Sequence, residues 1–539
     1  MRDHFSPSRC FIVVLTLLSV PATLALNFSF FEEAADARFA PEGYDYIIVG
    51  GGACGCALAA TLSQKFKVLL LERGDSPYGY PVLMREENFA VSMLDLAHSQ
   101  AFLTTDLVLN ARARVLGGGT SINGGFMTRA PKSEIDSIVG LDDYAQVNAS
   151  YEWLENGISS LPRTGPFQTA YKNALLQAGV TPDNGVTYDH LPGAKVGGTL
   201  FDGNGTRRPA SNLLPLYANL TNVQVVINAL VQKIIFSGSG TPKAVGVQVT
   251  GRLSGKTYTV LLRNSSKSEV ILTAGAIGTP QLLMLSGIGP RDHLQAKKIK
   301  VVADSPDVGK HIVDNPSTRV YIGSPSPVEV SLIQSVGIDP SGTYFEGLSS
   351  PQKSPIVVVT QKVAKPRSSG EIRLLTLNAD DNPQVTFNYF KDSVDMQTCV
   401  SGANTLEEVL LTSSFSPFIT AFQPMPSGGI VAAPNRRNPL LKPTINITLA
   451  LYCRTALATM WHYHGSCRVG KVVDRTYRVI GVEKLRVLDS SVFDFSPGTN
   501  PQSTFMMLAR YSIISHFRYS CFELNHLCRY MGLEMVKQA

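Results

Sequence analysis

The fold of this chain is decided by residues 45–60, DYIIVGGGACGCALAA. Residues 45–49 are mostly apolar and β-branched, the glycines after them predict a tight turn, and the alanine- and leucine-rich residues that follow predict a helix. A second apolar run, residues 67–71, predicts another strand, which ends at Glu72. We therefore expect a strand, a helix and a second strand that form a βαβ unit.

Three glycines of this unit, Gly50, Gly52 and Gly55, stand in the frame G-x-G-x-x-G, and Glu72 follows about 20 residues later. In a dinucleotide-binding unit the first glycine permits the turn, the second lets the backbone approach a pyrophosphate, and the third lets the helix pack closely on the strand. A carboxylate at position 72 accepts hydrogen bonds from a ribose diol and repels the 2′-phosphate of NADP. The unit predicts a site for the ADP half of FAD or NAD, and a glycine-rich turn in an unrelated fold is the alternative.

A second glycine-rich stretch, residues 113–125, has the sequence ARVLGGGTSINGG. Glycines beside an arginine and small hydroxyl residues suit a backbone that passes close to a flat or phosphorylated ligand. A plain surface loop, which uses glycine for its conformational freedom, is the alternative. Further along, the turn-rich residues 324–355 predict a loop over a pocket.

Length and composition are typical of a globular protein with several domains. The chain has 539 residues, of which 44% are hydrophobic and 17% charged, and a formal net charge of +6. At roughly 100 to 200 residues per domain, about two to four domains are expected. The composition excludes disorder, coiled coil and collagen as descriptions of the whole chain. Basic residues are scattered rather than grouped beside aromatic ones, so no nucleic-acid partner is predicted.

The first residues predict a cleaved secretory signal peptide, residues 1–25. Arg2 and Arg9 precede the mostly apolar run 11–20, and Thr23 and Ala25 are the small residues before the cleavage site. A membrane anchor is the alternative, but this run is shorter than the ~20 residues that span a bilayer. We expect a secreted, extracellular protein without a transmembrane anchor.

In a secreted protein, cysteines can form disulfides and Asn-x-Ser/Thr sequons can be glycosylated. Of eight cysteines, Cys10 leaves with the signal and seven remain, an odd number that excludes complete internal pairing. Cysteines and histidines lack the spacing of zinc ligands, so no metal site is predicted. A secreted chain can carry glycans at Asn27, Asn148, Asn204, Asn219, Asn264 and Asn446.

Two long motifs indicate a family. Residues 113–123 match the first signature of the glucose-methanol-choline (GMC) oxidoreductases, and residues 275–289, GAIGTPQLLMLSGIG, match the second. With the N-terminal fingerprint in front of them, they make the chain resemble this family from about Tyr44 to Tyr511. One departure is Met127, where the family usually has an aromatic residue or alanine. The resemblance is greatest to the plant subgroup that includes mandelonitrile lyases and HOTHEAD-related proteins.

The resemblance implies an α/β fold of two domains: a Rossmann-like FAD-binding domain and a discontinuous substrate-binding domain built on an antiparallel sheet. Residues 26–125, 195–300 and 455–511 would form the FAD-binding domain, and residues 126–194 and 301–454 the substrate-binding domain. Residues 512–539 would be an atypical C-terminal segment. FAD is expected to bind non-covalently, because the region of the first signature lacks the histidine to which some relatives attach it.

The two catalytic segments of the family correspond to residues 461–467, WHYHGSC, and 496–502, SPGTNPQ. Without the family, a histidine beside a tryptophan is more often a packed core residue than a catalytic one. The resemblance assigns His462 as the catalytic base and Asn500 as the group that holds the substrate oxygen. His464 is given no catalytic role, because the sequence does not establish that it shares a face with His462.

The resemblance also implies which residues contact FAD. Val231 would touch the adenine through its backbone, and Asn123 and Trp461 would lie near the flavin ring. The full set of expected cofactor residues is Gly50, Gly51, Gly52, Ala53, Cys54, Gly55, Glu72, Arg73, Val115, Gly119, Asn123, Gly124, Val231, Trp461, Asp489, Ser490, Pro501 and Gln502.

The expected activity is FAD-dependent oxidation of the CH–OH group of a small-molecule alcohol to an aldehyde or ketone. Hydride leaves an alcohol carbon readily only when the oxygen loses its proton, so a base must lie within hydrogen-bond reach of that oxygen. The partners would be the alcohol and oxygen or another electron acceptor. A non-catalytic secreted glycoprotein that keeps FAD for its structure is one alternative.

A hydroxynitrile lyase, which cleaves cyanohydrins, is the other alternative. Lyases of the plant subgroup use two histidines and a pocket cysteine and tyrosine. Here Asn500 stands at the second histidine position, Met460 at that of the tyrosine, and no cysteine lies between Cys56 and Cys399. The neutral amide of Asn500 also lacks the positive charge that stabilises departing cyanide. These departures point to the oxidase.

Two further expectations come from the resemblance. Plant relatives carry cysteines at the positions of Cys399 and Cys453, which implies a disulfide between them. The last helix of the family continues directly from residues 506–511 into a pattern that resumes here at residues 529–533, so residues 512–528 look like an unspliced intron or a gene-model error. The alternative is a genuine extension with a Cys521–Cys528 bridge, and a genuine insert would interrupt the helix.

Overall fold

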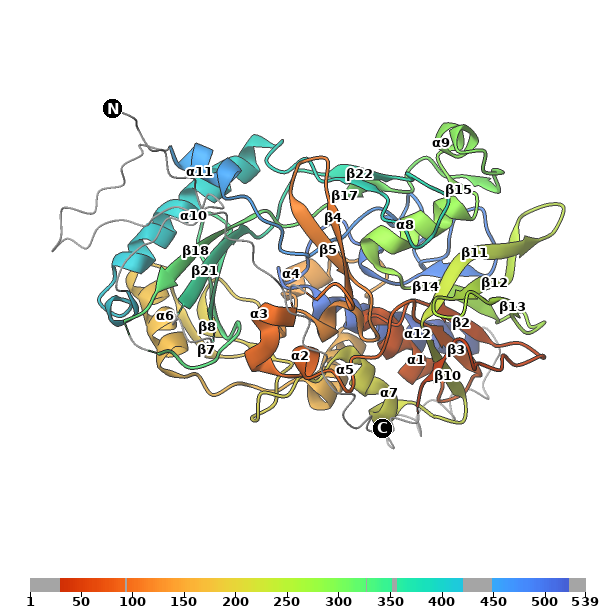
Figure 1. Ribbon diagram of the computed structural model, residues 1–539, viewed down its shortest axis with the longest axis horizontal. Coiled ribbons are helices and arrows are strands. Elements are labelled where there is room, and N and C mark those ends of the chain that lie inside the picture. Colours follow the sequence, from red (N-terminus) through yellow and green to blue (C-terminus); the bar gives the residue numbers. More distant parts are fainter. Residues whose placement is uncertain (1–29, 93–94, 326, 351–355, 420–447, 523–539) are drawn as a thin grey trace, which may run out of the picture.

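The computed structural model describes residues 30–92, 95–325, 327–350, 356–419 and 448–522. The expected signal peptide and the sequons at Asn27 and Asn446 lie outside the described residues. In Figure 1, one half of the molecule holds a parallel sheet with helices α1 and α12, and the other half holds a second sheet with helices α6 and α10.

The first sheet is parallel, with six strands in the order β1-β10-β3-β2-β14-β24. Every residue of β2 and β3 is buried, as expected for strands covered on both faces. The expected strands at residues 45–49 and 67–71 are therefore confirmed as two neighbours joined by α1. The bounds are β1 Glu32–Glu33, β2 Tyr46–Val49, β3 Val68–Leu71, β10 Val223–Ile227, β14 Glu269–Leu272 and β24 Leu485–Val487.

Helix α1, Ala53–Leu62, is buried on almost all sides. It packs against the sheet and against α12, Gln502–Phe522. The glycine and alanine residues of α1 are small and let both neighbours approach closely, and because the helix is buried nearly all round it has no polar face. Helix α12 runs unbroken past Tyr511 to Phe522, so the interruption expected of a genuine insert does not occur within the described residues. Residues 512–522 contain neither glycine nor proline, and nothing in them breaks a helix.

The second sheet has six strands in the order β18-β21-β20-β19-β8-β7. All neighbours in it are antiparallel except β7 and β8. One face packs on α6, Pro166–Gln177, and α10, Ser393–Leu411, through apolar side chains such as Phe345 and Val359. The bounds are β7 Asp183–Val186, β8 Gly193–Val196, β18 Ser317–Gly323, β19 Ser335–Ile338, β20 Thr343–Ser350 and β21 Ile356–Val363.

Together the two sheets confirm the expected fold class, an α/β fold with a second sheet that is largely antiparallel. The loop expected over residues 324–355 is wrong in part, because β19 and β20 lie there. Glycine, serine and threonine make these strands less apolar than the strands of the parallel sheet. The domain division stays a prediction, and its boundary at residues 194/195 falls inside β8.

Smaller sheets and helices make up the rest of the described structure. The antiparallel sheets and pairs are β11 Ala229–Ser237 with β12 Lys243–Gly251 and β13 Thr257–Leu261, β4 Ser99–Leu103 with β5 Leu109–Ala113, β6 Phe126–Met127 with β9 Gly198–Thr199, and β17 Lys310–Ile312 with β22 Gly370–Arg373 and β23 Gln384–Thr386. A parallel pair is β15 Ile288–Gly289 with β16 Ala303–Asp304. The remaining α-helices are α2 Pro81–Met84, α3 Phe89–Ser92, α4 Lys132–Ile135, α5 Tyr144–Ile158, α7 Leu213–Tyr217, α8 Gly275–Leu285, α9 Arg291–Ala296 and α11 Leu449–Thr455.

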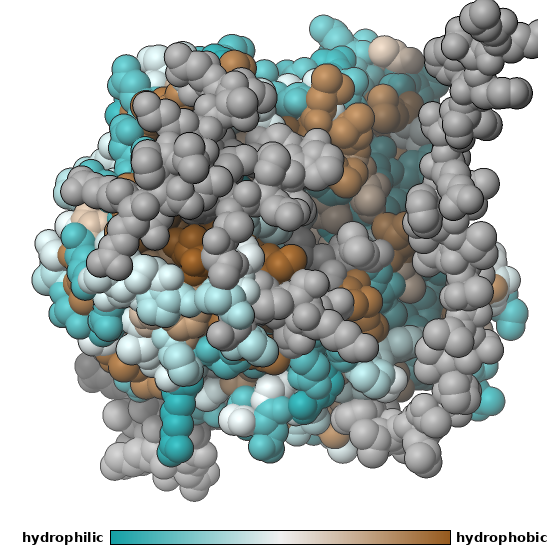
Figure 2. Space-filling view, turned by 60° about the vertical axis from the view of Figure 1, so that its left-hand side comes forward, coloured by the Kyte–Doolittle hydropathy of each residue, from teal (hydrophilic) through white to brown (hydrophobic). Residues whose placement is uncertain are grey.

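A disulfide joins Cys399 of α10 to Cys453 of α11, with 6.2 Å between the Cα atoms, which confirms the expected pair. Three other cysteines of the described residues, Cys54, Cys56 and Cys467, are buried and free. Among the described residues, none of the helices has the length and apolar character needed to cross a membrane. Figure 2 turns the half with α6 and α10 forward and shows apolar residues in the middle of that face.

Candidate cofactor and catalytic site

The glycines of the βαβ unit fall into two kinds. A Cβ atom at Gly55 would lie 2.0 Å from the carbonyl oxygen of Gly50, and one at Gly50 would lie 2.5 Å from the carbonyl oxygen of Thr273. Gly50 also has a φ of +109°, a conformation that side chains disfavour. These two glycines are needed for the packing of the chain on itself.

Gly52 is different, because the protein does not fill the space beside it. A Cβ atom there would meet only Gly118 Cα at 3.9 Å and the Thr273 carbonyl oxygen at 4.0 Å. Gly52 is also the N-cap of α1, and no side chain caps this end of the helix or places a negative charge in its first turn. Free N–H donors beside open space fit a pyrophosphate.

The second glycine cluster lies against the first. Gly117 donates a backbone hydrogen bond to the carbonyl oxygen of Gly51 at 2.7 Å, and a Cβ atom at Gly118 would lie 2.7 Å from Gly52 Cα. Gly119 has open space on its Cβ side. The alternative of a plain surface loop does not hold, since residues 117–121 pack on the turn that precedes α1.

Glu72 is buried behind this turn. Its two carboxylate oxygens accept hydrogen bonds from the backbone N–H groups of Gly51 and Gly74, both at 2.8 Å. Burial raises the pKa of Glu72, and these N–H groups and Arg73 oppose the rise. Each oxygen keeps a lone pair for a ribose hydroxyl, so the carboxylate fits the adenosine end of FAD.

Other expected cofactor residues are held by contacts within the protein. Asn123 Nδ2 donates to Gln502 Oε1 at 2.8 Å, which joins the two signature segments. Asp489 accepts hydrogen bonds from the Gly275 N–H at 2.8 Å and the Thr279 hydroxyl at 2.5 Å, so its carboxylate caps α8. The Ser490 hydroxyl accepts from Ala276 N–H at 3.2 Å.

The remaining members of the set have these places. Arg73 donates to the Gln100 amide oxygen at 2.6 Å and to the Ala113 carbonyl at 3.1 Å. Ala53 and Cys54 are in the first turn of α1, Val115 bridges to Asp75, Gly124 lies near Ile333, Val231 is in β11 and Pro501 precedes α12. Their contacts with FAD stay predictions.

The segment that carries His462 is anchored by Asp314. The backbone N–H of His462 donates to Asp314 Oδ1 at 2.9 Å. The other oxygen, Oδ2, accepts from the hydroxyls of Thr459 at 2.6 Å and Tyr389 at 2.7 Å. The Thr459 hydroxyl in turn accepts the backbone N–H of Trp461, whose φ is +59°. Asp314 therefore holds the backbone on both sides of the tryptophan.

The environment of His462 favours a neutral imidazole. Burial lowers the pKa of His462 well below its usual value, the charges of Lys362 and His464 lower it further, and the backbone of Thr499 opposes them. Its Nδ1 has no hydrogen-bond partner among the described residues. His464 is also buried, its Nδ1 lies 2.9 Å from the His462 carbonyl oxygen, and burial lowers its pKa to about 4.

Asn500 is part of a buried polar cluster that the sequence did not reveal. Its Oδ1 accepts a hydrogen bond from Lys362 Nζ at 3.0 Å, and its Nδ2 donates to Glu346 Oε1 at 2.7 Å. Lys362 and Glu346 form an ion pair at 2.7 Å. The one signal in the sequence was a lysine within the apolar run of β21, which is unusual for a buried strand.

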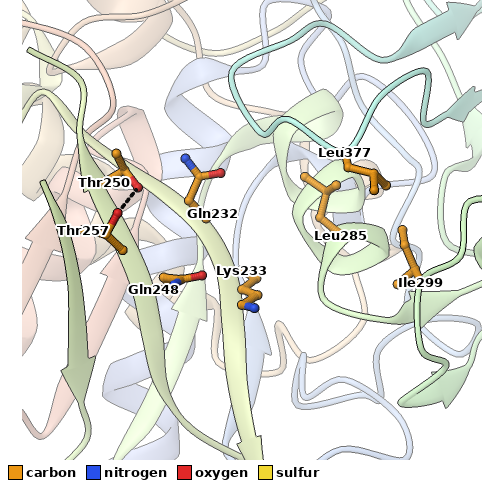
Figure 3. A pocket seen from close by; sticks show the side chains of 8 residues that line it. All are labelled: Gln232, Lys233, Gln248, Thr250, Thr257, Leu285, Ile299 and Leu377. Atoms are coloured by element: carbon orange, nitrogen blue, oxygen red, sulfur yellow. Dashed lines mark hydrogen bonds between the residues drawn. The ribbon is translucent and has the colours of Figure 1, made fainter. Parts of the chain in front are cut away.

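The structure thus brings His462 and Asn500 into one region through residues far apart in sequence. No group of three or more His, Cys, Asp or Glu side chains within the described ranges is arranged to hold a metal ion. A groove of about 380 Å³ between β11, β12 and α8, shown in Figure 3, is lined by Gln232, Lys233, Gln248, Thr250, Thr257, Leu285, Ile299 and Leu377. It holds none of the predicted catalytic residues.

Comparison with known proteins places the chain in one family. Two profiles described as GMC oxidoreductase match residues 44–317 and 366–509. The protein HOTHEAD from Arabidopsis thaliana is 42% identical over 522 residues, which cover 87% of each chain. (R)-mandelonitrile lyase 1 from Prunus serotina is 38% identical, with 92% of this chain and 90% of its own covered. Sinalpyl alcohol oxidase Nec3 from Nesocodon mauritianus is 39% identical, with 88% and 89% covered.

Solved structures share the fold. A formate oxidase superposes with a TM-score of 0.75 at 19% identity and covers 89% of this chain and 100% of its own. A pyridoxine 4-oxidase from Mesorbium loti has a TM-score of 0.73 at 19% identity, with 88% and 99% covered.

Proposed function

Since the chain belongs to the GMC oxidoreductase family, we propose that it oxidises an alcohol to an aldehyde or ketone, with FAD as its cofactor and His462 as the base. The observation that carries the proposal is the place of His462: its backbone N–H donates to Asp314 at 2.9 Å, and its side chain lies beside the backbone of Thr499, the residue before Asn500. Burial lowers the pKa of His462, so the imidazole stays unprotonated at neutral pH, as a base that takes a hydroxyl proton must be.

The residues expected to bind FAD offer the space and the hydrogen-bonding groups that FAD requires. Gly52 and Gly119 leave space that their own chain does not use, the uncapped end of α1 offers N–H donors, and Glu72 offers oxygens to a ribose. When bound, FAD supplies an acceptor for the hydride that leaves the alcohol carbon.

The chain itself positions the substrate and moves the proton. Asp314 accepts a hydrogen bond from the backbone of His462 and so fixes the position of the backbone that carries the imidazole. The imidazole accepts the hydroxyl proton, and the resulting negative charge on the substrate oxygen is met by an N–H of the Asn500 amide. Asn500 is neutral and therefore does not compete for that proton.

A hydroxynitrile lyase is the second candidate, and Lys362 is the observation in its favour. The Asn500 amide itself is neutral and brings no positive charge to the site. The ammonium of Lys362, however, lies 3.0 Å from the amide oxygen. A cation there favours any anion that forms in the site, cyanide included.

The deciding experiment is a visible spectrum of the purified secreted protein, followed without oxygen while aromatic and long-chain primary alcohols and then mandelonitrile are added. Loss of the flavin absorbance with an alcohol supports the oxidase. Cyanide release from mandelonitrile well above the background rate, with no alcohol bleaching the flavin, would assign the lyase. A flavin that responds to neither substrate class would assign a non-catalytic FAD-binding glycoprotein.

Secretion with N-linked glycans belongs to the same proposal. Asn204 and Asn264 are exposed, and Asn148 and Asn219 are partly exposed, so these sequons are accessible to modification. We expect the protein from the culture medium to begin near residue 26 and to lose mass on treatment with a peptide-N-glycosidase. Intact N-terminal residues on the mature protein would contradict it.

A further inference from the structure

Glu346, Lys362 and Asn500 form a closed triangle of hydrogen bonds. Glu346 lies on β20 and Lys362 on β21, where Tyr344 pairs with Lys362 and Glu346 with Thr360. Glu346 and Lys362 therefore point to the same face of the sheet, opposite to the face that packs on α6 and α10. Asn500 reaches this face from the segment just before α12.

The chemistry of the two charged groups determines how the amide is turned. An ammonium only donates hydrogen bonds and a carboxylate only accepts them. The carbonyl oxygen of Asn500 must therefore face Lys362, at 3.0 Å, and its NH₂ group must face Glu346, at 2.7 Å. One N–H of the amide is left over, and it has no partner among the described residues.

Stability does not explain why a charged pair occupies this place. The side chains of Lys362 and Glu346 are 0% and 2% exposed. Removing two charges from water is costly, and well-packed apolar residues in their place are often as stable or more so. We therefore look for a role of this buried ion pair other than stability, beside the expected catalytic segments.

We infer that Lys362 and Glu346 are positioning residues, which hold Asn500 as a fixed hydrogen-bond donor to the substrate oxygen. The inference rests on the proposed function, and it applies equally to the hydroxyl of an alcohol or of a cyanohydrin. Lys362 also places a positive charge near His462 and so helps to keep the base unprotonated.

The charged and titratable groups around Lys362 come from several elements. Glu346 and the ring of Tyr344, 4.5 Å from Nζ, lie on β20, and Asp314 lies before β18. Burial lowers the pKa of His190 and of His462, the charge of Lys362 lowers both further, and His464 acts on His462 in the same direction. Burial lowers the pKa of Lys362, and the carboxylate of Glu346 opposes this. His462 is the group whose protonation matters for the reaction.

The test compares Lys362→Met with Lys195→Met in the FAD-loaded protein. Lys195 is a matched control, because it is also buried, on β8 of the same sheet, and donates to Thr128 Oγ1 at 2.8 Å rather than to Asn500. A double variant, Lys362→Met with Glu346→Gln, removes both charges and leaves no unpaired charge buried. Melting temperature and flavin content show whether each variant folds.

Two readouts distinguish positioning from structure. The first is kcat and KM on the substrate found above, where misplacement of Asn500 should lower kcat by up to about 10²-fold and change KM less. The second is the pH dependence of carbethoxylation of His462 by diethylpyrocarbonate, mapped by mass spectrometry. This reagent modifies neutral imidazole and requires no turnover.

We expect both Lys362 variants to lose turnover and to move the midpoint of His462 modification upward toward pH 6.5, the ordinary value. Lys195→Met should lower the melting temperature and leave both readouts unchanged. Wild-type turnover and modification in the Lys362 variants would overturn the inference, as would equal changes in Lys195→Met. If no substrate is turned over by the wild type, the proposed function fails, and the modification profile alone decides whether Lys362 acts on His462.

Discussion

At the nucleotide-binding site, the groups that fit FAD come mostly from one stretch, residues 50–72. At the expected catalytic site, the polar groups come from five distant places in the chain. The first site consists mainly of backbone N–H groups and of space left by glycines. The second consists of side chains, with Asp314, Glu346 and Lys362 arranged around His462 and Asn500. The first is therefore sensitive to added atoms, and the second to lost or altered polar groups.

The largest effect is expected from Gly55→Val, because its Cβ atom would lie 2.0 Å from the Gly50 carbonyl oxygen and force α1 off the sheet. We expect no soluble folded protein. Gly52→Val is the matched change, since its Cβ atom meets nothing closer than 3.9 Å. It should fold and lack the yellow flavin. Soluble yield, circular dichroism and the 450 nm absorbance measure the difference, and full flavin content in Gly52→Val would reject the cofactor assignment.

At the expected catalytic site, the variant His462→Ala should keep its flavin. Its rate of flavin reduction should fall by a factor on the order of 10²–10⁴, because no base takes the hydroxyl proton. His293→Gln on α9 is the control, since His293 bonds only to Arg373 and to the Leu374 N–H. Stopped-flow spectra without oxygen give both rates. A His462→Ala rate close to wild type would remove His462 from the mechanism.

Acid should destabilise the protein through His464. Burial lowers its pKa to about 4 in the folded chain, against an ordinary 6.5. Between these pH values the unfolded chain binds a proton that the folded chain does not, so the free energy of unfolding falls as the pH drops, by about 3 kcal/mol at pH 4. Glu72, whose pKa burial raises, contributes with the opposite sign.

The variant His464→Gln tests this. Urea unfolding at pH 7 and pH 4.5 should show a smaller difference between the two conditions than in the wild type. The same difference in both proteins would mean that other groups cause the acid sensitivity.

Loss of the disulfide should lower stability without loss of flavin. Cys399 and Cys453 are separated by 54 residues, and closing a loop of this size is worth roughly 2–4 kcal/mol. The double variant Cys399→Ala/Cys453→Ala should therefore melt at a lower temperature, with flavin content unchanged because the bridge joins α10 to α11. Release of flavin at temperatures where the rest of the chain stays folded would show that the two halves are coupled more tightly.

The smallest effect is expected at Asp314. Asp314→Ala removes the acceptor for the His462 N–H and for the hydroxyls of Thr459 and Tyr389, and a displacement of the base of about 1 Å costs up to about 10²-fold in kcat. Asp314→Asn keeps one acceptor oxygen and should recover part of the loss. Equal kcat in the two variants would mean that the negative charge of Asp314 matters, rather than the position of His462.

Much of the fold was predictable because it depends on local pattern. The buried strands β2 and β3 are continuous apolar runs, and Gly50 before α1 and Gly55 within it are required by contacts of 2.5 Å or less. The strands β19 (SVGI) and β20 (TYFEGLSS) were missed, since glycine, serine and threonine interrupt the apolar run in each and are typical of turns. The cysteine pair could be predicted only through relatives.

The sequence by itself determined the βαβ unit and the positions of its glycines, because each depends on neighbouring residues. The two catalytic segments were assigned only through the resemblance to the family, and their roles stay predictions. Only the tertiary structure decided the surroundings of His462 and Asn500. Asp314, Glu346 and Lys362 are ordinary polar residues in their own segments, and they gain a role only when strand pairing and helix packing bury them within hydrogen-bond distance of residues more than a hundred positions away.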